Sequence, residues 1–198
     1  MLRRFLGRLG YAVVPSGLKR NLGPRDGVLE GLRERLLATR REHGRTVSLV
    51  GWSLGGVLAR ELARACPDHV RQVITLGSPF TRDVTATNAT RLYEAVSGEG
   101  AHDNPEIRNA IAGDLPVPTT SIYSRTDGIV NWQTCHLNPS DTAENIEVYL
   151  ASHTGLGVNP AALWAVADRL AQAEGEFRQF DRSGPFAIAY APPENAQS

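Results

Sequence analysis

The stretch that decides the fold is LVGWSLGGVLAREL, which runs from Leu49 to Leu62. Its first residues are apolar and typical of a buried strand, and the residues after Gly55 have the spacing of an amphipathic helix. Ser53 lies between Gly51 and Gly55 at the junction, in the pattern G-x-S-x-G. A sharp turn from strand to helix lifts a serine hydroxyl above the end of a sheet, so Ser53 is a candidate nucleophile. The pentapeptide alone is common, and the rest of the chain must support this interpretation.

Composition predicts one globular domain over residues 1–198, because 41% of the chain is hydrophobic and 21% is charged. Basic and acidic residues number 21 each, so no overall positive field would attract nucleic acid, and we expect no nucleic-acid partner. No apolar run approaches the ~20 residues needed to span a bilayer, which predicts no stable membrane insertion. The start MLRRFLGRLGY lacks the pattern of a signal peptide, which favours a cytoplasmic protein.

The two cysteines, Cys66 and Cys135, do not form a disulfide framework, and neither lies in a CxxC pair of the kind that holds zinc. A single bridge between them stays open as an alternative. Cys135 has no glycine elbow beside it, so we interpret it as a buried structural thiol and not as a nucleophile.

Several segments before the serine have clear periodicity. The apolar residues of Leu2–Leu9 recur with helical spacing, which favours a helix that packs on the core over one that lies on a membrane surface. Tyr11–Val14 is expected to be a short strand, ended by Pro15. A helix is predicted from Asp26 to Glu42, with Gly44 as its stop.

The remaining segments alternate between strands and helices, which predicts an α/β fold with a mostly parallel sheet and helices on both faces. Thr46–Gly51 is β-branched and mostly apolar, as expected of a strand that is covered on both faces. Asn159 is expected to cap the last long helix and Pro160 to begin it. The other expected elements are a helix at Leu54–Cys66, strands at 70–77, Thr119–Ser124 and Asn145–Leu150, and the end of the last helix near Ala173.

Two regions interrupt this alternation. Residues 80–118 are polar and longer than a tight connection requires, so we expect a small cap or lid insertion with helical pieces near 90–96 and 105–112. Residues 174–198 form a C-terminal extension with an apolar island, which we expect to pack on the body before it frays.

A serine hydroxyl needs a base and a carboxylate before it becomes an effective nucleophile. Asp127 follows one predicted strand in SIYSRTDGIVNW, and His153 follows the last predicted strand in VYLASHTGLGVNP. Open α/β sheets carry their sites at these strand ends. The sequence therefore predicts a catalytic triad of Ser53, Asp127 and His153. Ser53 would also lie at a helix N-terminus, where the backbone N–H of Leu54 can donate to an oxyanion.

Other histidines and acids are weaker candidates for these roles. Among the histidines, His43 lies near a helix end and His69 in a loop, while His102 falls in the expected cap and His136 after the acid loop. The alternative acids are Asp114 and Asp141, and neither of them directly follows a strand.

Four stretches together resemble the α/β-hydrolase superfamily in its lipase and esterase branch: GWSLGG, TLGSPF, SRTDGIV and SHTGLGVNP. The resemblance covers about residues 11–173, and the order Ser53, Asp127, His153 matches the order of that superfamily. It implies a covalent acyl-enzyme on Ser53, with His153 as general base and then acid, Asp127 orienting it, and no metal or organic cofactor.

The chain departs from this resemblance at its start. Members of the superfamily usually have earlier strands, and the loop after one of them supplies a second oxyanion donor, whereas Met1 falls inside what resembles the helix after that loop. Coding sequence upstream of Met1 could hold the missing strand, or a partner chain could complete the sheet, giving a homodimer if a strand edge is left open. We favour a third arrangement, in which Tyr11–Val14 pairs with Thr46–Gly51 and backbone N–H groups near Ser16–Leu18 replace the donor.

The expected function is a serine esterase or lipase of lipid metabolism, which hydrolyses a small-molecule carboxylic ester. A short- to medium-chain acyl group is favoured, because the insertion carries few large apolar residues, namely Leu92, Tyr93, Val96, Ile107 and Ile111. The alternatives are an acyl transferase on the same machinery and a non-catalytic α/β-hydrolase-like binding protein.

Overall fold

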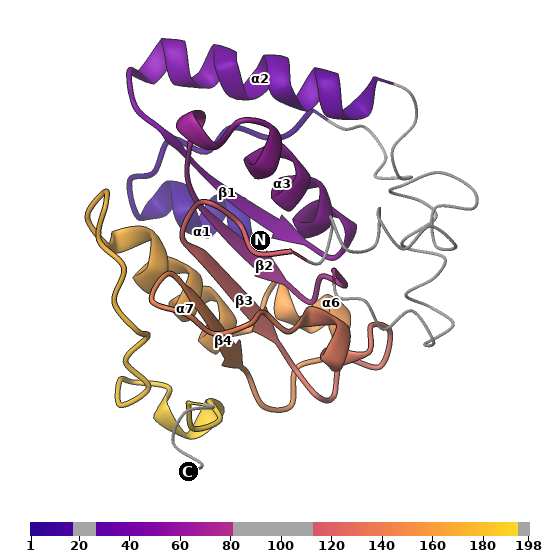
Figure 1. The fold of residues 1–198 in the computed structure, drawn as a ribbon. Helices are drawn as coiled ribbons and strands as arrows, with labels where there is room; N and C mark the ends of the chain where they lie inside the picture. Colours follow the sequence, from indigo (N-terminus) through magenta and orange to yellow (C-terminus); the bar gives the residue numbers. More distant parts are fainter. Residues whose placement is uncertain (18–26, 81–112, 194–198) are drawn as a thin grey trace, which may run out of the picture.

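A computed structural model describes residues 1–17, 27–80 and 113–193 of the chain. Its centre is a four-stranded sheet in the order β1-β2-β3-β4, and every neighbouring pair of strands is parallel (Figure 1). This confirms the predicted α/β class. The strands are β1 (Val47–Trp52), β2 (Val70–Leu76), β3 (Thr119–Tyr123) and β4 (Ala143–Glu147), each within three residues of its predicted bounds.

Helices cover both faces of the sheet (Figure 1). On one face, α2 (Val28–His43) and α3 (Leu54–Ala65) share an apolar cluster with Val73 of β2. On the other face, α1 (Leu2–Arg8) and α7 (Pro160–Ala171) pack with Ile74 of the same strand. Successive residues of β2 thus serve opposite layers, as the twofold period of a strand requires. Short helices complete the fold: η1 (Pro67–His69), η3 (Trp132–Cys135), α6 (His153–Leu156) and η4 (Ala187–Ala189).

The predicted helix ends are confirmed where the sequence carried a specific signal. The Asn159 side chain accepts from the backbone N–H of Ala161 at 2.8 Å and of Ala162 at 3.2 Å, while Pro160 takes the first helical position of α7. Gly44 ends α2 with a φ of +66°, a conformation that glycine adopts without steric cost.

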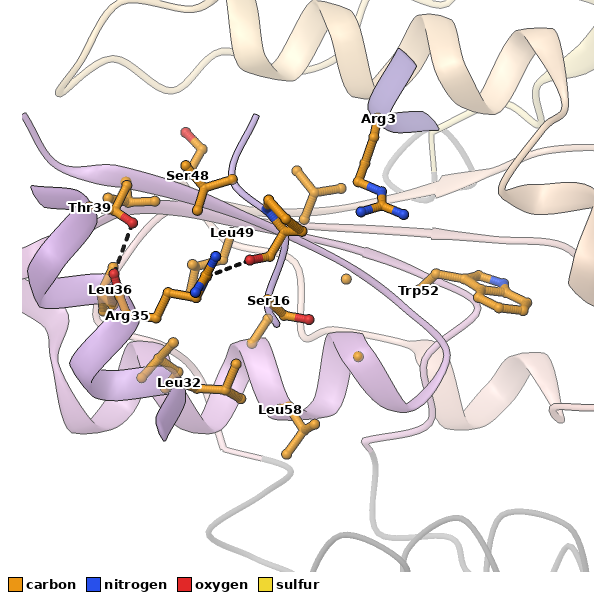
Figure 2. A pocket seen from close by; sticks show the side chains of 18 residues that line it. Arg3, Ser16, Leu32, Arg35, Leu36, Thr39, Ser48, Leu49, Trp52 and Leu58 are labelled. Carbon is orange, nitrogen blue, oxygen red and sulfur yellow. Dashed lines mark hydrogen bonds between the residues drawn. The ribbon is translucent and has the colours of Figure 1, made fainter. Parts of the chain in front are cut away.

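The predicted strand at Tyr11–Val14 is wrong. This segment forms no strand, and Tyr11 and Val13 pack against the cluster of α1 and α7 instead. The carbonyl of Pro15 accepts from Arg35 Nε at 2.6 Å, so a side chain of α2 takes the place of a sheet partner (Figure 2). The apolar run that indicated a strand reflects this packing on one face, since Tyr11 and Val13 are partly buried while Val14 is 41% exposed.

The outer edge of β1 borders a groove with a cavity volume of about 460 Å³ (Figure 2). Leu49 and Trp52 of β1, Leu32 and Leu36 of α2, and Ser16 are among the residues that line it. In the described part of the chain, β1 pairs only with β2, and its first four residues are only partly buried. The expectation that this strand pairs with the segment before α2 is therefore wrong, because that segment is held on the far side of the groove. The expectation that it is covered on both faces is confirmed, since Val47 and Leu49 pack with the α2 and α3 cluster and Val50 packs with the α1 and α7 cluster.

The C-terminal extension packs on the body at the opposite edge of the sheet. Val148, directly beyond β4, forms an antiparallel bridge with Tyr190, and the Tyr190 hydroxyl donates to the carbonyl of Ala161 at 2.8 Å. The predicted cap lies almost wholly at 81–112, outside the described residues, as do the last five residues. Among the described helices, none has the length and apolar character needed to cross a membrane.

Candidate active site

Ser53 lies at a strained turn between β1 and α3. Its φ of 54° and ψ of −129° place a non-glycine residue in a rarely populated region, which functional sites tolerate more often than the rest of a protein. The Ser53 N–H donates to the carbonyl of Leu76 at 2.8 Å, which fixes the turn to the end of β2. A Cβ on Gly51 would overlap the backbone of Gly55 and Gly56, so the close approach of strand and helix requires glycine at this position.

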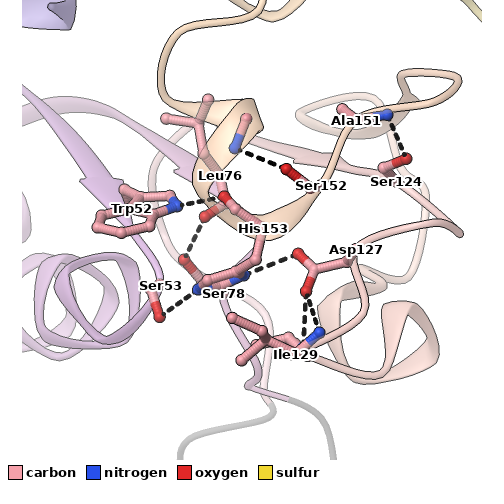
Figure 3. A network of polar contacts seen from close by, with 12 residues as sticks. Trp52, Ser53, Leu76, Ser78, Ser124, Asp127, Ile129, Ala151, Ser152 and His153 are labelled. Carbon is pink, nitrogen blue, oxygen red and sulfur yellow. Dashed lines mark hydrogen bonds and ion pairs between the residues drawn. The ribbon is translucent and has the colours of Figure 1, made fainter.

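His153 is the first residue of α6, and its ring is directed toward Ser53 (Figure 3). Its Nε2 lies 3.0 Å from the Ser53 Oγ. The preceding Ser152 caps α6, because its side chain accepts from the Gly155 N–H at 3.1 Å. The cap sets the direction of the short helix and therefore the position of the imidazole.

Asp127 lies on the other side of the imidazole. Its Oδ2 is 2.8 Å from His153 Nδ1, while its Oδ1 accepts from the N–H groups of Ile129 at 3.0 Å and Val130 at 2.7 Å (Figure 3). A further backbone bond, from His153 N–H to the Asp127 carbonyl at 2.9 Å, joins the two loops. One carboxylate oxygen is thus held by the backbone, and the other is presented to the histidine.

The structure therefore brings together the three residues that the sequence singled out, although they follow β1, β3 and β4 and are separated by up to 100 positions. Asp127 and His153 are 4% and 5% exposed, so their hydrogen bond lies where water screens it little. In this geometry Nε2 can accept the proton of the Ser53 hydroxyl, and the carboxylate can hold the tautomer with Nδ1 protonated and stabilise an imidazolium.

Three residues around the site were not predicted from the sequence. Gly77 follows β2 with a φ of +53°, and a Cβ there would lie 3.0 Å from Asp127 Oδ2 and 3.3 Å from His153 Nδ1. A Cβ on Gly56 would overlap the side chain of Ser78. Trp52 donates from its indole N–H to the His153 carbonyl at 2.9 Å. The sequence shows only that Gly77 directly follows a strand. The need for glycine there comes from Asp127 and His153, which are far from it in the chain.

The other candidate bases and acids have different surroundings. His43 is exposed at the end of α2, His69 is part of η1, and His136 packs against the rings of Tyr123 and Trp132. The rival acids Asp114 and Asp141 are both exposed, and His102 lies outside the described residues.

Both cysteines are free and buried, so the alternative of a bridge between Cys66 and Cys135 is wrong. Burial raises the pKa of the Cys135 thiol, and a thiol that stays protonated is a poor nucleophile. Within residues 1–17, 27–80 and 113–193, no three His, Cys, Asp or Glu side chains gather as metal ligands.

The oxyanion side of the site is less complete. Leu54 is the first residue of α3, so its backbone N–H has no acceptor within the helix and is available to a ligand. A second donor was expected from N–H groups near Ser16–Leu18, through pairing of Tyr11–Val14 with β1. That pairing does not form, Ser16 lines the groove beside β1, and Leu18 is outside the described residues.

Comparisons with known proteins agree with this architecture. The chain superposes on lipase B of Aspergillus fumigatus with a TM-score of 0.63 and 20% identity, covering 86% of this chain and 49% of that one. It also superposes on the esterase domain of a Rhodothermus marinus protein, with a TM-score of 0.57, 18% identity, and coverage of 85% and 76%. A third structure is the mature Bacillus licheniformis lipase BlEst2, with a TM-score of 0.54, 16% identity, and 72% coverage of each chain. At these identities the likeness shows the fold, and the chain spans about half the length of the Aspergillus lipase.

Comparison with curated proteins gave no match. The family model described as a PGAP1-like alpha/beta domain matches residues 31–134, just over half of the chain. The match includes Ser53 and Asp127 and ends before His153. By this match the chain belongs to the PGAP1-like alpha/beta domain family, and its fold is similar to that of the lipases and the esterase above.

Proposed function

We propose that this protein is a serine hydrolase of carboxylic esters that forms an acyl-enzyme on Ser53. The observation that carries the proposal is the continuous relay from the Ser53 hydroxyl through His153 to Asp127, with contacts of 3.0 and 2.8 Å. A binding protein has no need of this relay or of the strained serine backbone. The solved structures of similar fold that are described as lipases or an esterase add support to a hydrolytic reaction.

The reaction proceeds in two similar halves. The Ser53 Oγ attacks the ester carbonyl while its proton passes to His153 Nε2, and the alcohol then leaves with that proton. A water molecule enters, gives a proton to the same nitrogen, and attacks the acyl-enzyme, so that the acid is released and Ser53 regains its proton. Asp127 holds the ring and stabilises its charged form, and the Leu54 N–H donates to the oxyanion in both halves.

Short- to medium-chain esters are the proposed substrates. This preference follows from the few large apolar residues of the 80–118 insertion, nearly all of which lies outside the described residues. Near the candidate site, Ile129 is 50% exposed and offers apolar surface.

The test is a series of p-nitrophenyl esters of rising chain length, hydrolysed by the wild type, by Ser53→Ala and by Ser140→Ala. Ser140 is a matched control, because it is exposed and lies just before β4, at the end of the sheet opposite to the triad. We expect Ser53→Ala to lower kcat by about 10⁴-fold or more and Ser140→Ala to keep wild-type rates. Activity should be highest on the shorter chains.

A fluorophosphonate probe gives a second readout, because it reacts with an activated serine whatever the natural substrate. Labelling should occur on Ser53 alone and should be lost in the Ser53→Ala variant. Equal hydrolysis by wild type and Ser53→Ala, or labelling of another residue, would contradict the proposal.

A further inference from the structure

Trp52 links the first strand of the sheet to the loop that follows the last one. It is the last residue of β1, next to Ser53, and its indole N–H donates to the His153 carbonyl at 2.9 Å (Figure 3). The indole and imidazole ring centroids are 5.2 Å apart, with a tilt of 37°. β1 and β4 lie at opposite edges of the described sheet, so this contact joins segments that no sheet ladder connects.

The carbonyl of His153 is free to accept this bond because α6 is so short. In a longer helix the N–H four residues ahead would bond to it. Here that N–H belongs to Gly157, and it bonds to the Gly155 carbonyl instead. The backbone of His153 is therefore held by Trp52 at its carbonyl and by Asp127 at its N–H.

The contacts with Asp127 and with Trp52 lie on different sides of His153. Asp127 fixes the Nδ1 side through both its side chain and its backbone carbonyl. On the side of Ser53, the described structure has the Trp52 contact and the reacting pair itself, with Nε2 3.0 Å from Oγ. A fixed distance between these two atoms is needed for proton transfer, and the reacting pair cannot supply it during the step in which its own bond is broken.

From this arrangement we infer that Trp52 is a positioning residue for His153. The hydrogen bond from its indole N–H to the His153 carbonyl keeps Nε2 within hydrogen-bonding distance of the Ser53 hydroxyl. The inference rests on the proposed function of Ser53 and His153, and it assigns a role to a residue that no sequence pattern marked. The residue type matters here, because tryptophan combines a long rigid side chain with a single donor at its far edge.

The first experiment compares Trp52→Phe with Trp164→Phe. Phenylalanine keeps an aromatic ring and removes the N–H. Trp164, on α7, is a matched control because it is 41% exposed against 42% for Trp52, and its ring contacts Phe186 and not the triad. We expect Trp52→Phe to lower kcat on p-nitrophenyl acetate about 10- to 100-fold with little change in KM, and to slow fluorophosphonate labelling equally. Trp164→Phe should match the wild type.

The second experiment does not require turnover. In protein labelled with ¹⁵N-histidine, the His153 Nδ1 proton bonded to Asp127 should give a far-downfield NMR signal, assigned by its loss in His153→Gln. We expect Trp52→Phe to broaden or shift this signal at unchanged circular dichroism, and Trp164→Phe to leave it in place. If the wild type hydrolyses no ester, the proposed function fails, while this spectrum still tests whether Trp52 holds the ring.

Two outcomes would overturn the inference. One is wild-type kcat and an unchanged His153 signal in folded Trp52→Phe. The other is a rise in KM with kcat unchanged, which would make Trp52 a substrate contact and not a positioning residue.

Discussion

The two edges of the sheet differ in how they are covered. Beyond β4, the C-terminal tail bonds repeatedly to the strand: Arg182 donates to the Asn145 carbonyl at 2.8 Å, and the Ala191 N–H to the Glu147 carbonyl at 3.2 Å. Beyond β1, the described chain leaves a groove of about 460 Å³, bridged by the contact of Arg35 with Pro15. The candidate nucleophile follows the less covered strand, and the candidate base follows the more covered one.

This difference shows how a short sheet can support a precise site. Exposed strand edges are prone to pair with other chains, and proteins protect them with charge or with covering segments. On the β4 side the protection is a packed tail, whereas on the β1 side Arg3 and Arg35 border the groove. The position of Ser53 therefore depends on α3, on β2 and on the turn itself more than on a strand beyond β1.

The largest effect is expected from breaking the ion pair that anchors the tail beside β4. Arg169 of α7 is 1% exposed and contacts Glu144 and the carbonyl of Arg178. Removing its charge in Arg169→Met leaves the buried Glu144 without its ion-pair partner on α7 and with the Phe180 N–H as a remaining donor. We expect the free energy of unfolding to fall by about 3–5 kcal/mol in urea titrations.

The dependence of this loss on pH provides a sharper version of the test. Burial raises the pKa of Glu144, and the charge of Arg169 opposes the rise, so the variant should raise it further. A carboxyl whose folded-state pKa lies above its unfolded value binds more protons when folded. Stability therefore falls as the pH rises through the range between these two pKa values. The loss should therefore be larger near about pH 7 than near about pH 5. The double variant Glu144→Gln with Arg169→Met should recover much of it, and a loss that is independent of Glu144 would contradict this account.

A smaller effect should distinguish the cores behind the two edges. Leu36 lines the groove and is 4% exposed, while Leu170 of α7 is 6% exposed and packs in the cluster behind β4. We expect Leu170→Ala to cost about 3–4 kcal/mol and Leu36→Ala about 2 kcal/mol, because the cost of a truncation depends on the new space it creates and Leu36 already borders a groove. Equal costs, measured by urea unfolding of both variants, would show that the groove is filled in solution.

The smallest effect concerns a single hydrogen bond of the tail. Tyr190→Phe removes the donor to the Ala161 carbonyl and leaves the buried ring in place. We expect a loss of about 1 kcal/mol in thermal unfolding. Tyr149→Phe is the control, since that ring is 42% exposed just beyond β4 and should cost almost nothing. If Tyr190→Phe is as stable as the wild type, this bond does not help to close the β4 edge.

Much of the local structure could be predicted because its causes are local. The strained turn at Ser53 follows from the glycines around it, and the start of α7 follows from the Asn159 cap and Pro160. The grouping of Ser53, Asp127 and His153 was also predictable, since parallel strands bring their carboxyl ends to one edge of the sheet.

Tertiary contacts decided the rest. Tyr11–Val14 has the apolar, β-branched composition of a strand, yet it packs on the α1 and α7 layer, because composition indicates burial and not a hydrogen-bonded partner. Gly77 and Trp52 matter only because the loops after β3 and β4 approach them in space. The sequence by itself determined the turn, the order of the elements and the three side chains of the candidate site. Only the folded chain decided which edge of the sheet is covered and which neighbours hold His153, because both depend on contacts between residues far apart in the chain.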